Sequence, residues 1–358
     1  MEGDHWPRGL CGNAGAGLAR LRKRASEFFE RLSVAELAHE AHRHLWVSDW
    51  MRLSDEYRMA AEAARDDGFV QVAHEARLCS LTSFEVARNL TCRADRADVD
   101  LADDVGSSQS RFEADLDDTI EHVQLDCDDQ EPLSGFFLPA SRRDSAAPAI
   151  ICIGDGEITR GSMMTRLLPA SLGRNMSLLF LDAGDSRARR VFKQEHILQC
   201  WMDHLLARTD VDPQRIAVYG EGAGAGCASR VALSDRRVAA AVCDGDLVTS
   251  VRRRASVRWM TGIEQACHDA TETLPPPRRI SCPLLIVVGE RSMVREEEAL
   301  ELQAGYRQAG ADCSVVVPNR IPSPLGEVEN FIAVDDFIFE WFGAKLGSAP
   351  QPDPLTRL

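Results

Sequence analysis

Short apolar runs alternate with helical patterns over the last two thirds of the chain, and this alternation constrains the fold more than any other feature. The runs lie near residues 120–125, 135–138, 149–153, 177–181, 215–219, 238–242, 284–288 and 313–317. Continuous apolar stretches of this length are typical of strands buried on both faces of a sheet. Helical patterns separate the later runs, at residues 192–207, 223–233, 293–309 and 331–346. The sequence therefore predicts an α/β domain with a mostly parallel, eight-stranded sheet, whose sites lie at the carboxyl ends of its strands.

The first 92 residues predict a separate, all-helical domain. Its earliest apolar positions recur at spacings of three and four, as in an amphipathic helix: Leu18, Leu21, Ala25, Phe28 and Leu32. Ser33 and Glu36 have the spacing of a capping box, which predicts the start of a second helix. Further helices are expected over residues 49–65, closed by Gly68, and over residues 69–90.

An acidic stretch separates the two predicted domains. Residues 93–118 are rich in aspartate and poor in apolar side chains, which is typical of a solvated linker. The pattern of strands and helices in the remainder places the α/β core over residues 119–347, followed by a C-terminal tail over residues 348–358.

Charge and composition argue against several classes of partner. The net charge of −15 opposes binding to nucleic acid or to anionic lipid. No apolar run approaches the roughly 20 residues that span a bilayer, and the N-terminus lacks the pattern of a secretory signal. We therefore expect a cytoplasmic protein whose partner is a small molecule or another protein. The eleven cysteines form no CxxC pair, which favours separate buried thiols over a disulfide framework.

The most informative segment runs from Asp212 to Asp246. It has the strand, the turn of small residues and the helix of a nucleophile elbow, in which G-x-S-x-G presents a serine above a sheet. Residues 220–224 read Gly-Glu-Gly-Ala-Gly, so Gly222 stands where the serine would be. The glycine spacing fits a dinucleotide-binding fingerprint poorly, so nucleotide binding is not expected here.

This segment resembles α/β-hydrolases that carry an N-terminal helical domain. That group includes FrsA-like esterases, pseudooxynicotine C–C hydrolases and fungal enzymes that shorten polyketide chains. The resemblance extends to residues 147–161, similar to the family's loop after its third strand, and to residues 178–186, similar to its Asp-x-Pro-Gly-x-Gly loop. It also covers residues 282–294, where the family's acid follows a strand, and the final helix. The resemblance implies an α/β-hydrolase fold over most of the chain.

The resemblance also implies a catalytic triad in the order serine, acid, histidine. Gly222 takes the place of the serine, and Ser292 takes the place of the acid. The histidine is expected after the last strand, where residues 318–321 read Pro-Asn-Arg-Ile, and no histidine follows His268. All three triad members are therefore predicted to be missing, and acyl transfer through a serine ester is not expected.

The backbone of the elbow can act without a serine. By the resemblance, the amides of Ala223 and of Asp155 or Gly156 would form an oxyanion hole, and an enolate or phenolate oxygen could enter it beside Gly222. The alternative is an ordinary tight turn. Candidate acids and bases are the carboxylates predicted at strand ends, with Asp182 and Glu221 as first choices and loop or cap roles as the alternative: Asp155, Glu157, Asp182, Asp185, Glu221, Asp244 and Asp246.

The residues predicted to bind the substrate lie in both domains: Gly156, Glu157, Trp46, Trp50, Asp246 and Arg320. For Glu157 the alternative is a bond to the loop backbone, and for the two tryptophans it is core packing. Cys227 is interpreted as a packed thiol, since no cation that would activate it is evident. The histidines near Trp46 have no evident carboxylate or cysteine partner, so no metal site is expected.

These features lead to one leading hypothesis and two alternatives. The leading hypothesis is a cofactor-independent, non-hydrolytic enzyme of specialised metabolism. It would form, rearrange or cleave a carbon–carbon bond of an aromatic or polyketide-like substrate through an enolate. The first alternative is a catalytically silent homologue that binds a ligand or a partner protein, and the second is a hydrolase with rearranged acid and base residues. A homodimer is compatible with each of them.

Overall fold

The structure of the protein is a computed structural model. It describes residues 16–91, 120–126, 133–140, 145–154, 160–181, 191–247, 279–289, 292–323 and 326–347. The chain divides into two compact units. The first comprises Met1–Asp118, Gly161–Arg174 and Pro318–Phe339, and the second comprises Thr119–Arg160, Asn175–Val317 and Glu340–Leu358. Two segments that the sequence places in the α/β core therefore group with the N-terminal helices.

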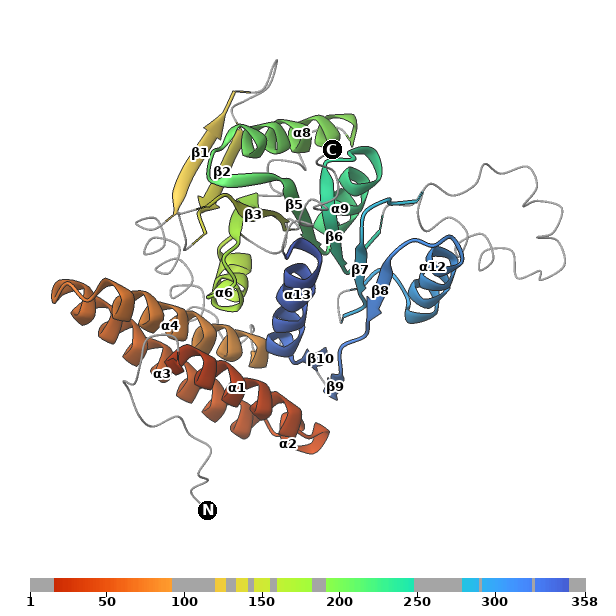
Figure 1. Cartoon of the computed structure of the whole chain (residues 1–358). Coiled ribbons are helices and arrows are strands. Elements are labelled where there is room, and N and C mark those ends of the chain that lie inside the picture. The colour runs from red at the N-terminus through yellow and green to blue at the C-terminus, as the bar shows by residue number, and fades with distance from the viewer. Residues whose placement is uncertain are drawn as a thin grey trace, which may run out of the picture. The chain divides into compact units, whose positions relative to one another are not determined.

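An eight-stranded sheet organises the second unit (Figure 1). Its strands are β1 (Glu121–Leu125), β2 (Leu133–Leu138), β3 (Ala147–Ile153), β4 (Ser177–Leu181), β5 (Val211–Glu221), β6 (Val238–Asp244), β7 (Leu284–Val287) and β8 (Cys313–Val316). They lie in the order β1-β2-β4-β3-β5-β6-β7-β8, in which β2 is antiparallel to β1 and β4 and all other neighbours are parallel. The predicted fold class, with its mostly parallel sheet, is confirmed.

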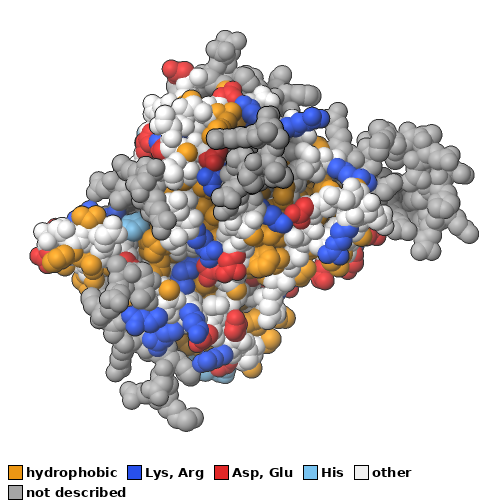
Figure 2. Space-filling view, viewed as in Figure 1, with side chains coloured by type: hydrophobic (Ala, Val, Ile, Leu, Met, Phe, Trp, Pro, Cys, Tyr) orange, Lys and Arg blue, Asp and Glu red, His pale blue; other side chains and the backbone are white. Residues whose placement is uncertain are grey.

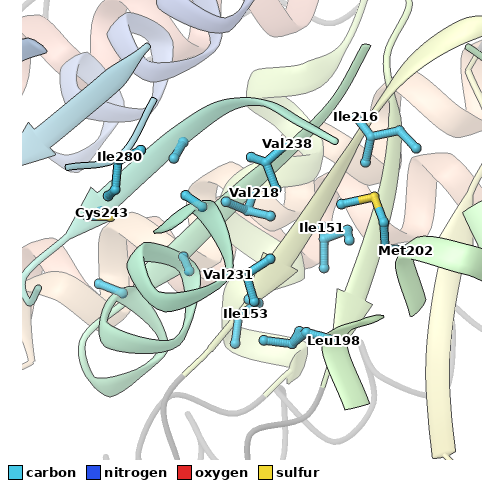
Figure 3. Packing of buried hydrophobic residues seen from close by; sticks show 14 of the residues in the cluster. Ile151, Ile153, Leu198, Met202, Ile216, Val218, Val231, Val238, Cys243 and Ile280 are labelled. Carbon is cyan, nitrogen blue, oxygen red and sulfur yellow. The ribbon is translucent and has the colours of Figure 1, made fainter. Parts of the chain in front are cut away.

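The apolar runs form strands because both of their faces are covered. Every residue of β3, β4 and β7 is buried, as expected for continuous apolar strands in a parallel sheet. One face of the sheet packs against three helices: α8 (Val191–Ala207), α9 (Ala223–Ser234) and α12 (Glu296–Gln308). Figure 3 shows part of this core, which includes Ile151, Met202, Val218, Val231 and Val238. The packing of these helices against the sheet holds in place the strand ends at which the candidate site lies.

Four helices open the first unit: α1 (Ala16–Arg31), α2 (Val34–Ala38), α3 (Glu40–Asp66) and α4 (Val70–Leu90). The capping box predicted before α2 is confirmed, since the Glu36 amide donates to Ser33 Oγ at 3.3 Å and the Ser33 amide donates to Glu36 Oε2 at 3.0 Å. Gly68, with φ of 78°, follows α3 as predicted. Helix α3 begins at Glu40 rather than near residue 49, because the buried Val47 extends its inner face.

The first unit also contains later parts of the chain: α6 (Arg160–Ser171), β9 (Arg320–Ser323), β10 (Gly326–Glu329) and the start of α13 (Phe331–Leu346). Ion pairs tie the start of α13 to α1 and α6. Asp336 accepts from Arg22 at 2.9 Å, and the buried Asp335 lies 3.0 Å from Arg166 Nε. The sequence predicts neither α6, which contains Pro169, nor the four-residue strands of the β9–β10 hairpin.

Charged side chains of both signs share the surface. On the face shown in Figure 2, lysine and arginine side chains lie among aspartate and glutamate. Pairs four residues apart account for part of this mixture on α3, where Arg52 bonds Glu56 at 2.7 Å and Arg58 bonds Glu62 at 2.8 Å. In the described ranges, no helix has both the length and the apolar character needed to cross a membrane.

Among the described residues, the cysteines follow the sequence-based expectation except at Cys200. The free thiols among the described residues are Cys79, Cys152, Cys227, Cys243, Cys282 and Cys313. Cys200 instead forms a disulfide bond. The prediction of separate thiols is therefore wrong at Cys200, because spacing along the sequence does not report which cysteines meet in the folded chain.

Candidate active site

The predicted elbow is a sharp turn between β5 and α9. Gly222 connects them with φ of 55° and ψ of −125°, a backbone conformation that residues other than glycine rarely adopt. Its amide donates to the Asp244 carbonyl at 2.8 Å, and its carbonyl accepts from the Ala225 amide at 3.1 Å. The turn therefore leads directly from the carboxyl end of β5 into the N-terminus of α9.

Two further glycines let the backbone close tightly around this turn. A Cβ on Gly220 would lie 2.3 Å from the Gly224 carbonyl oxygen, and a Cβ on Gly224 would lie 2.1 Å from the Ile153 carbonyl oxygen. Real Cβ atoms do not approach backbone atoms this closely. Glycine is thus required at both positions, and the N-terminus of α9 is held against the carboxyl end of β3.

The N-terminus of α9 presents backbone donors at this edge of the sheet. The first amides of any helix have no carbonyl partner within the helix, and the helix dipole gives this end a partial positive charge. Ala223 is the first residue of α9 and is exposed. It also follows the residue at the bend, which is the position of an oxyanion-hole donor in a nucleophile elbow. This end of the helix can stabilise a negatively charged oxygen.

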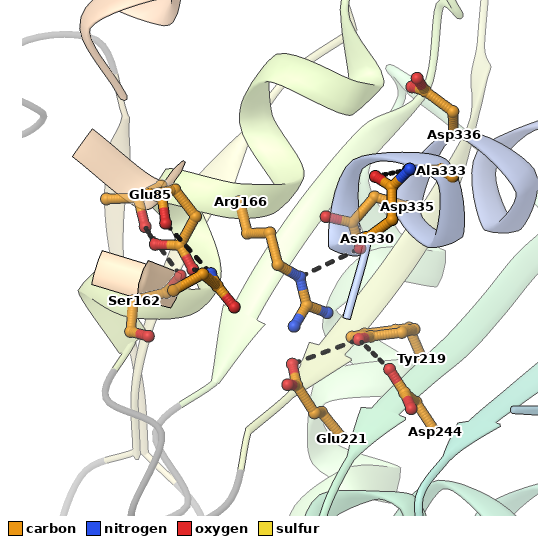
Figure 4. A network of polar contacts seen from close by, with 12 residues as sticks. Glu85, Ser162, Arg166, Tyr219, Glu221, Asp244, Asn330, Ala333, Asp335 and Asp336 are labelled. Carbon is orange, nitrogen blue, oxygen red and sulfur yellow. Dashed lines mark hydrogen bonds and ion pairs between the residues drawn. The ribbon is translucent and has the colours of Figure 1, made fainter. Parts of the chain in front are cut away.

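Three polar side chains gather at the ends of β5 and β6, around the residue that precedes the turn (Figure 4). Tyr219 and Glu221 are two residues apart on β5 and therefore share one face of the sheet, and Asp244 of β6 is the register partner of Glu221. The Tyr219 hydroxyl lies 3.2 Å from Glu221 Oε2 and 3.2 Å from Asp244 Oδ2. Tyr219 and Glu221 are only 1% and 6% exposed. A buried carboxyl group thus immediately precedes the bend.

The structure brings together part of the predicted catalytic set. Glu221, Gly222 and Ala223 form the end of β5, the bend and the start of α9. Tyr219 is absent from the predicted set, although its spacing of two residues from Glu221 within an apolar run indicates a shared face. Among the described residues, no three His, Cys, Asp or Glu side chains are placed to hold a metal ion. The predicted site residues outside the described ranges are Asp155, Gly156, Glu157, Asp182 and Asp185.

Asp246 and Cys227 lie beside the first turns of α9. Asp246 Oδ1 accepts from the Leu247 amide at 2.7 Å, and its Oδ2 is 3.3 Å from where a Cβ on Gly226 would stand. Burial raises the pKa of the Cys227 thiol, with a smaller opposing effect from Arg230. A thiol with a raised pKa is a poor nucleophile at neutral pH, which supports the interpretation of Cys227 as a packed side chain. A role for Asp246 in substrate binding stays a prediction.

The other predicted substrate-binding residues lie in the first unit. Trp50 is 4% exposed and packs edge-on against Phe28, with ring centroids 5.9 Å apart. Trp46 makes a similar contact with Phe28 at 5.5 Å. Arg320 bonds Glu327 across the β9–β10 hairpin at 3.0 Å. These contacts account for packing and hairpin pairing, and a role in substrate binding stays a prediction for Trp46, Trp50 and Arg320.

Ser292, at the position where the resemblance implies a triad acid, belongs to a turn. Its hydroxyl lies 3.1 Å from the Gly245 carbonyl and 2.8 Å from the Val294 carbonyl, and it accepts from the Val294 amide at 3.2 Å. These contacts join the loop after β7 to the loop after β6. A serine hydroxyl carries no negative charge with which to stabilise an imidazolium. The hydrogen bonds of Ser292 instead stabilise the turn.

Comparisons with solved structures agree with this architecture. No protein-family model and no curated protein matches the sequence. A 2,6-dihydroxy-pseudo-oxynicotine hydrolase superposes with a TM-score of 0.51 over 87% of this chain and 92% of that chain, at 17% identity. A Pyrococcus horikoshii acylaminoacyl peptidase gives a TM-score of 0.46 at 11% identity, over 65% of this chain and 43% of that chain. A Pyrococcus furiosus esterase gives 0.45 at 17% identity, over 65% of this chain and 96% of that chain.

The 2,6-dihydroxy-pseudo-oxynicotine hydrolase has the α/β-hydrolase fold, and the sheet and flanking helices described above have it too. The chain is therefore an α/β-hydrolase-fold protein with an N-terminal helical region. At such low identity the likeness defines the fold alone, so the activity has to be argued from the site.

Proposed function

We propose that the protein is a cofactor-independent, non-hydrolytic enzyme of specialised metabolism. It acts on an aromatic or polyketide-like ketone and forms, rearranges or cleaves a carbon–carbon bond through an enolate. The observation that carries this proposal is the turn at Gly222. That turn has the strand, bend and helix N-terminus of a nucleophile elbow, offers no nucleophilic side chain, and follows directly on the buried carboxyl group of Glu221.

In this proposal Glu221 is the base. Its carboxylate takes a proton from the carbon next to the substrate carbonyl, and the electron pair of the broken C–H bond moves onto the carbonyl oxygen. The Ala223 amide and the dipole of α9 stabilise the resulting enolate. The enolate carbon then attacks a second carbonyl, and the new alkoxide takes the proton back from Glu221. The reverse sequence cleaves a carbon–carbon bond.

The side chains around the turn support a non-hydrolytic reaction. A covalent acyl intermediate needs an activated nucleophile, whereas Gly222 has no side chain and the hydroxyl of Ser292 is engaged with backbone groups. Glu221 is also too buried to be in free contact with bulk water. Direct proton transfer from a bound carbon acid is therefore favoured over activation of water.

Exchange of ketone hydrogens with solvent tests the base and the oxyanion site together. Acetophenone is incubated with the protein in D2O, and loss of its methyl proton signal is followed by NMR. We expect exchange above the buffer rate. The enzyme-dependent rate should fall at least about 100-fold in Glu221→Gln, because the amide keeps the shape of the side chain but cannot take the proton. The matched control is Glu298→Gln, since Glu298 of α12 is similarly buried, at 7% exposed, and it should leave exchange unchanged.

Two results would contradict the proposal, and each favours a different alternative. Absence of exchange above the buffer rate would favour a catalytically silent homologue that binds a ligand or partner. Turnover of p-nitrophenyl acetate that depends on Glu221 would favour a hydrolase with a rearranged base.

A further inference from the structure

Two exposed histidines lie side by side where α2 meets α3 (Figure 1). His39 stands between the two helices, because it follows the last residue of α2 and precedes Glu40, the first residue of α3. His42 lies in the first turn of α3. The centroids of the two imidazole rings are 5.0 Å apart, with an angle of 30° between the ring planes. An ion in solution can therefore reach both rings at once.

The fold does not use the side chains of these histidines to join the helices. His39 holds the N-cap position of α3, yet its side chain makes no capping hydrogen bond. Its backbone makes the joint instead, since its amide donates to the Glu36 carbonyl at 3.1 Å and its carbonyl accepts from the His42 amide at 3.0 Å. Within the described part of the chain, the His42 ring contacts those of His39 and Trp46, the latter with centroids 6.0 Å apart, and the nitrogens of both imidazoles are without a hydrogen bond.

The separation of the rings is that of two imidazoles bound to one metal ion. Imidazole nitrogens bind transition metals at about 2.0–2.1 Å, which places the metal about 3 Å from the centre of each ring. Two rings on one ion, at roughly the tetrahedral angle, then have centres about 5 Å apart, and the observed separation is 5.0 Å. Imidazole suits Zn2+, Ni2+ and Cu2+, and of these Cu2+ binds a given nitrogen site most tightly.

Two carboxylates offset the one unfavourable feature of this place. The N-terminus of α3 carries a partial positive charge, which disfavours a cation. Glu40 lies in the first turn of α3, and Glu36 is close enough to His42 for an electrostatic interaction between their side chains. Glu36 stays bonded to Ser33, whose hydroxyl lies 2.7 Å from Glu36 Oε2. Glu36 therefore lowers the electrostatic cost of a bound cation without acting as a ligand.

We propose that His39 and His42 form a binding site for a divalent transition metal ion, with Cu2+ preferred. The two imidazoles occupy neighbouring coordination positions and water fills the others, since no three metal-binding side chains meet among the described residues. A bound ion links the residue before α3 to the first turn of α3, and so fixes the joint between α2 and α3. Spacing along the sequence does not predict the site, because it does not report how the two rings are turned. Glu221 belongs to the other unit, so the metal site and the proposed reaction are tested separately.

Fluorescence of Trp46 can report on the site, because its ring lies 6.0 Å from that of His42 and bound Cu2+ quenches a nearby tryptophan. The reference protein is the full chain with His5→Gln, which removes the histidine next to Trp6, and it is titrated with CuSO4 at pH 7. We expect quenching that saturates. Each of His39→Gln and His42→Gln should raise the dissociation constant at least about tenfold, because a second linked ligand adds its effective concentration to binding.

The matched control is His122→Gln, at an exposed histidine of β1, which should leave the dissociation constant unchanged. Electron spin echo spectra of the Cu2+ complex should show two coordinated imidazoles in the reference protein and one in either single variant. Trp46→Phe should keep this spectrum and lose most of the quenching. Both histidines are exposed, so the variants should keep the helical circular dichroism of the reference protein. An unchanged dissociation constant in either single variant, quenching that does not saturate, or a single coordinated imidazole in the reference protein would overturn the proposal.

Discussion

Replacing Gly224 with alanine should destabilise the protein, although the same change stabilises most helices. Gly224 is the second residue of α9. An alanine Cβ there would lie 2.1 Å from the Ile153 carbonyl oxygen and 2.6 Å from the Gly154 carbonyl oxygen, whereas ordinary contacts are 3.4 Å or longer. Both neighbours are backbone atoms, so no side chain can rotate away. The start of α9 or the end of β3 must therefore move by about 1 Å or more.

The expected loss follows from two opposing terms. Helix propensity favours alanine by up to about 1 kcal/mol. Overpacking costs about 1–3 kcal/mol, and contact with two carbonyl oxygens places Gly224 at the upper end of this range. The free energy of unfolding should therefore fall by about 2 kcal/mol. The matched control is Gly305→Ala in α12, where nothing lies within 4 Å of the new Cβ, and it should gain about 0.5–1 kcal/mol.

Urea denaturation at pH 7, followed by circular dichroism, measures both variants. The midpoint should lie below that of the wild type for Gly224→Ala and above it for Gly305→Ala. A Gly224→Ala midpoint equal to or above the wild type would refute the close approach of α9 to β3. Exchange of acetophenone should also slow in Gly224→Ala, since movement of α9 displaces the Ala223 amide.

Three other substitutions probe the same unit. Gly222→Ser should lower the free energy of unfolding, measured by urea denaturation, by about 1–3 kcal/mol, because serine would have to adopt φ of 55°. Appreciable turnover of p-nitrophenyl acetate by this variant would show that the site contains an acid and a base able to activate a serine. A hydrogen bond from Arg237 holds the pKa of Asp235 below its usual value, so this carboxylate adds stability above about pH 4 that is lost as the pH falls through the lowered pKa. Asp235→Asn should lower the free energy of unfolding by about 1 kcal/mol at pH 7, a figure discounted because the Arg237 side chain is 38% exposed, and by less at pH 2. An equal loss at both pH values would contradict the assignment. Because burial raises the pKa of Cys227, its thiol should react with iodoacetamide at pH 7 far more slowly in the native protein than in urea, and Cys227→Ser should keep acetophenone exchange.

The sheet is predictable because each of its central strands needs apolar side chains on both faces. The run at residues 177–181, for example, coincides with β4, all of whose residues are buried. The β9–β10 hairpin carries no such pattern, since its short strands contain Arg320 and Glu327. The grouping of α6 with the start of α13 depends on contacts such as Arg166 with Asp335. These residues are far apart in the sequence, so no local pattern reports their contact.

The turn of the candidate site is also predictable, whereas the polar cluster is only partly so. Close backbone contacts require glycine at residues 220 and 224, and a positive φ favours glycine at residue 222. These three requirements produce the pattern of glycine at every second position that the sequence shows. The link between Glu221 and Asp244 arises from the register of β5 against β6. Register depends on pairing across the sheet, so the sequence identifies both carboxylates as strand-end residues without bringing them together.

The shape of the turn is set by its neighbours rather than by the side chain at residue 222. Close contacts at Gly220 and Gly224 seat α9 on the sheet, and the Gly222 amide is bonded to the Asp244 carbonyl. These contacts fix the direction of the backbone donors of α9, and none of them involves a side chain at residue 222. What such a turn retains is electrostatic stabilisation of an oxyanion, and what it lacks is the means to form an acyl intermediate. In the proposed reaction the oxyanion therefore arises by proton transfer, and this step is the role proposed for the buried carboxyl group of Glu221.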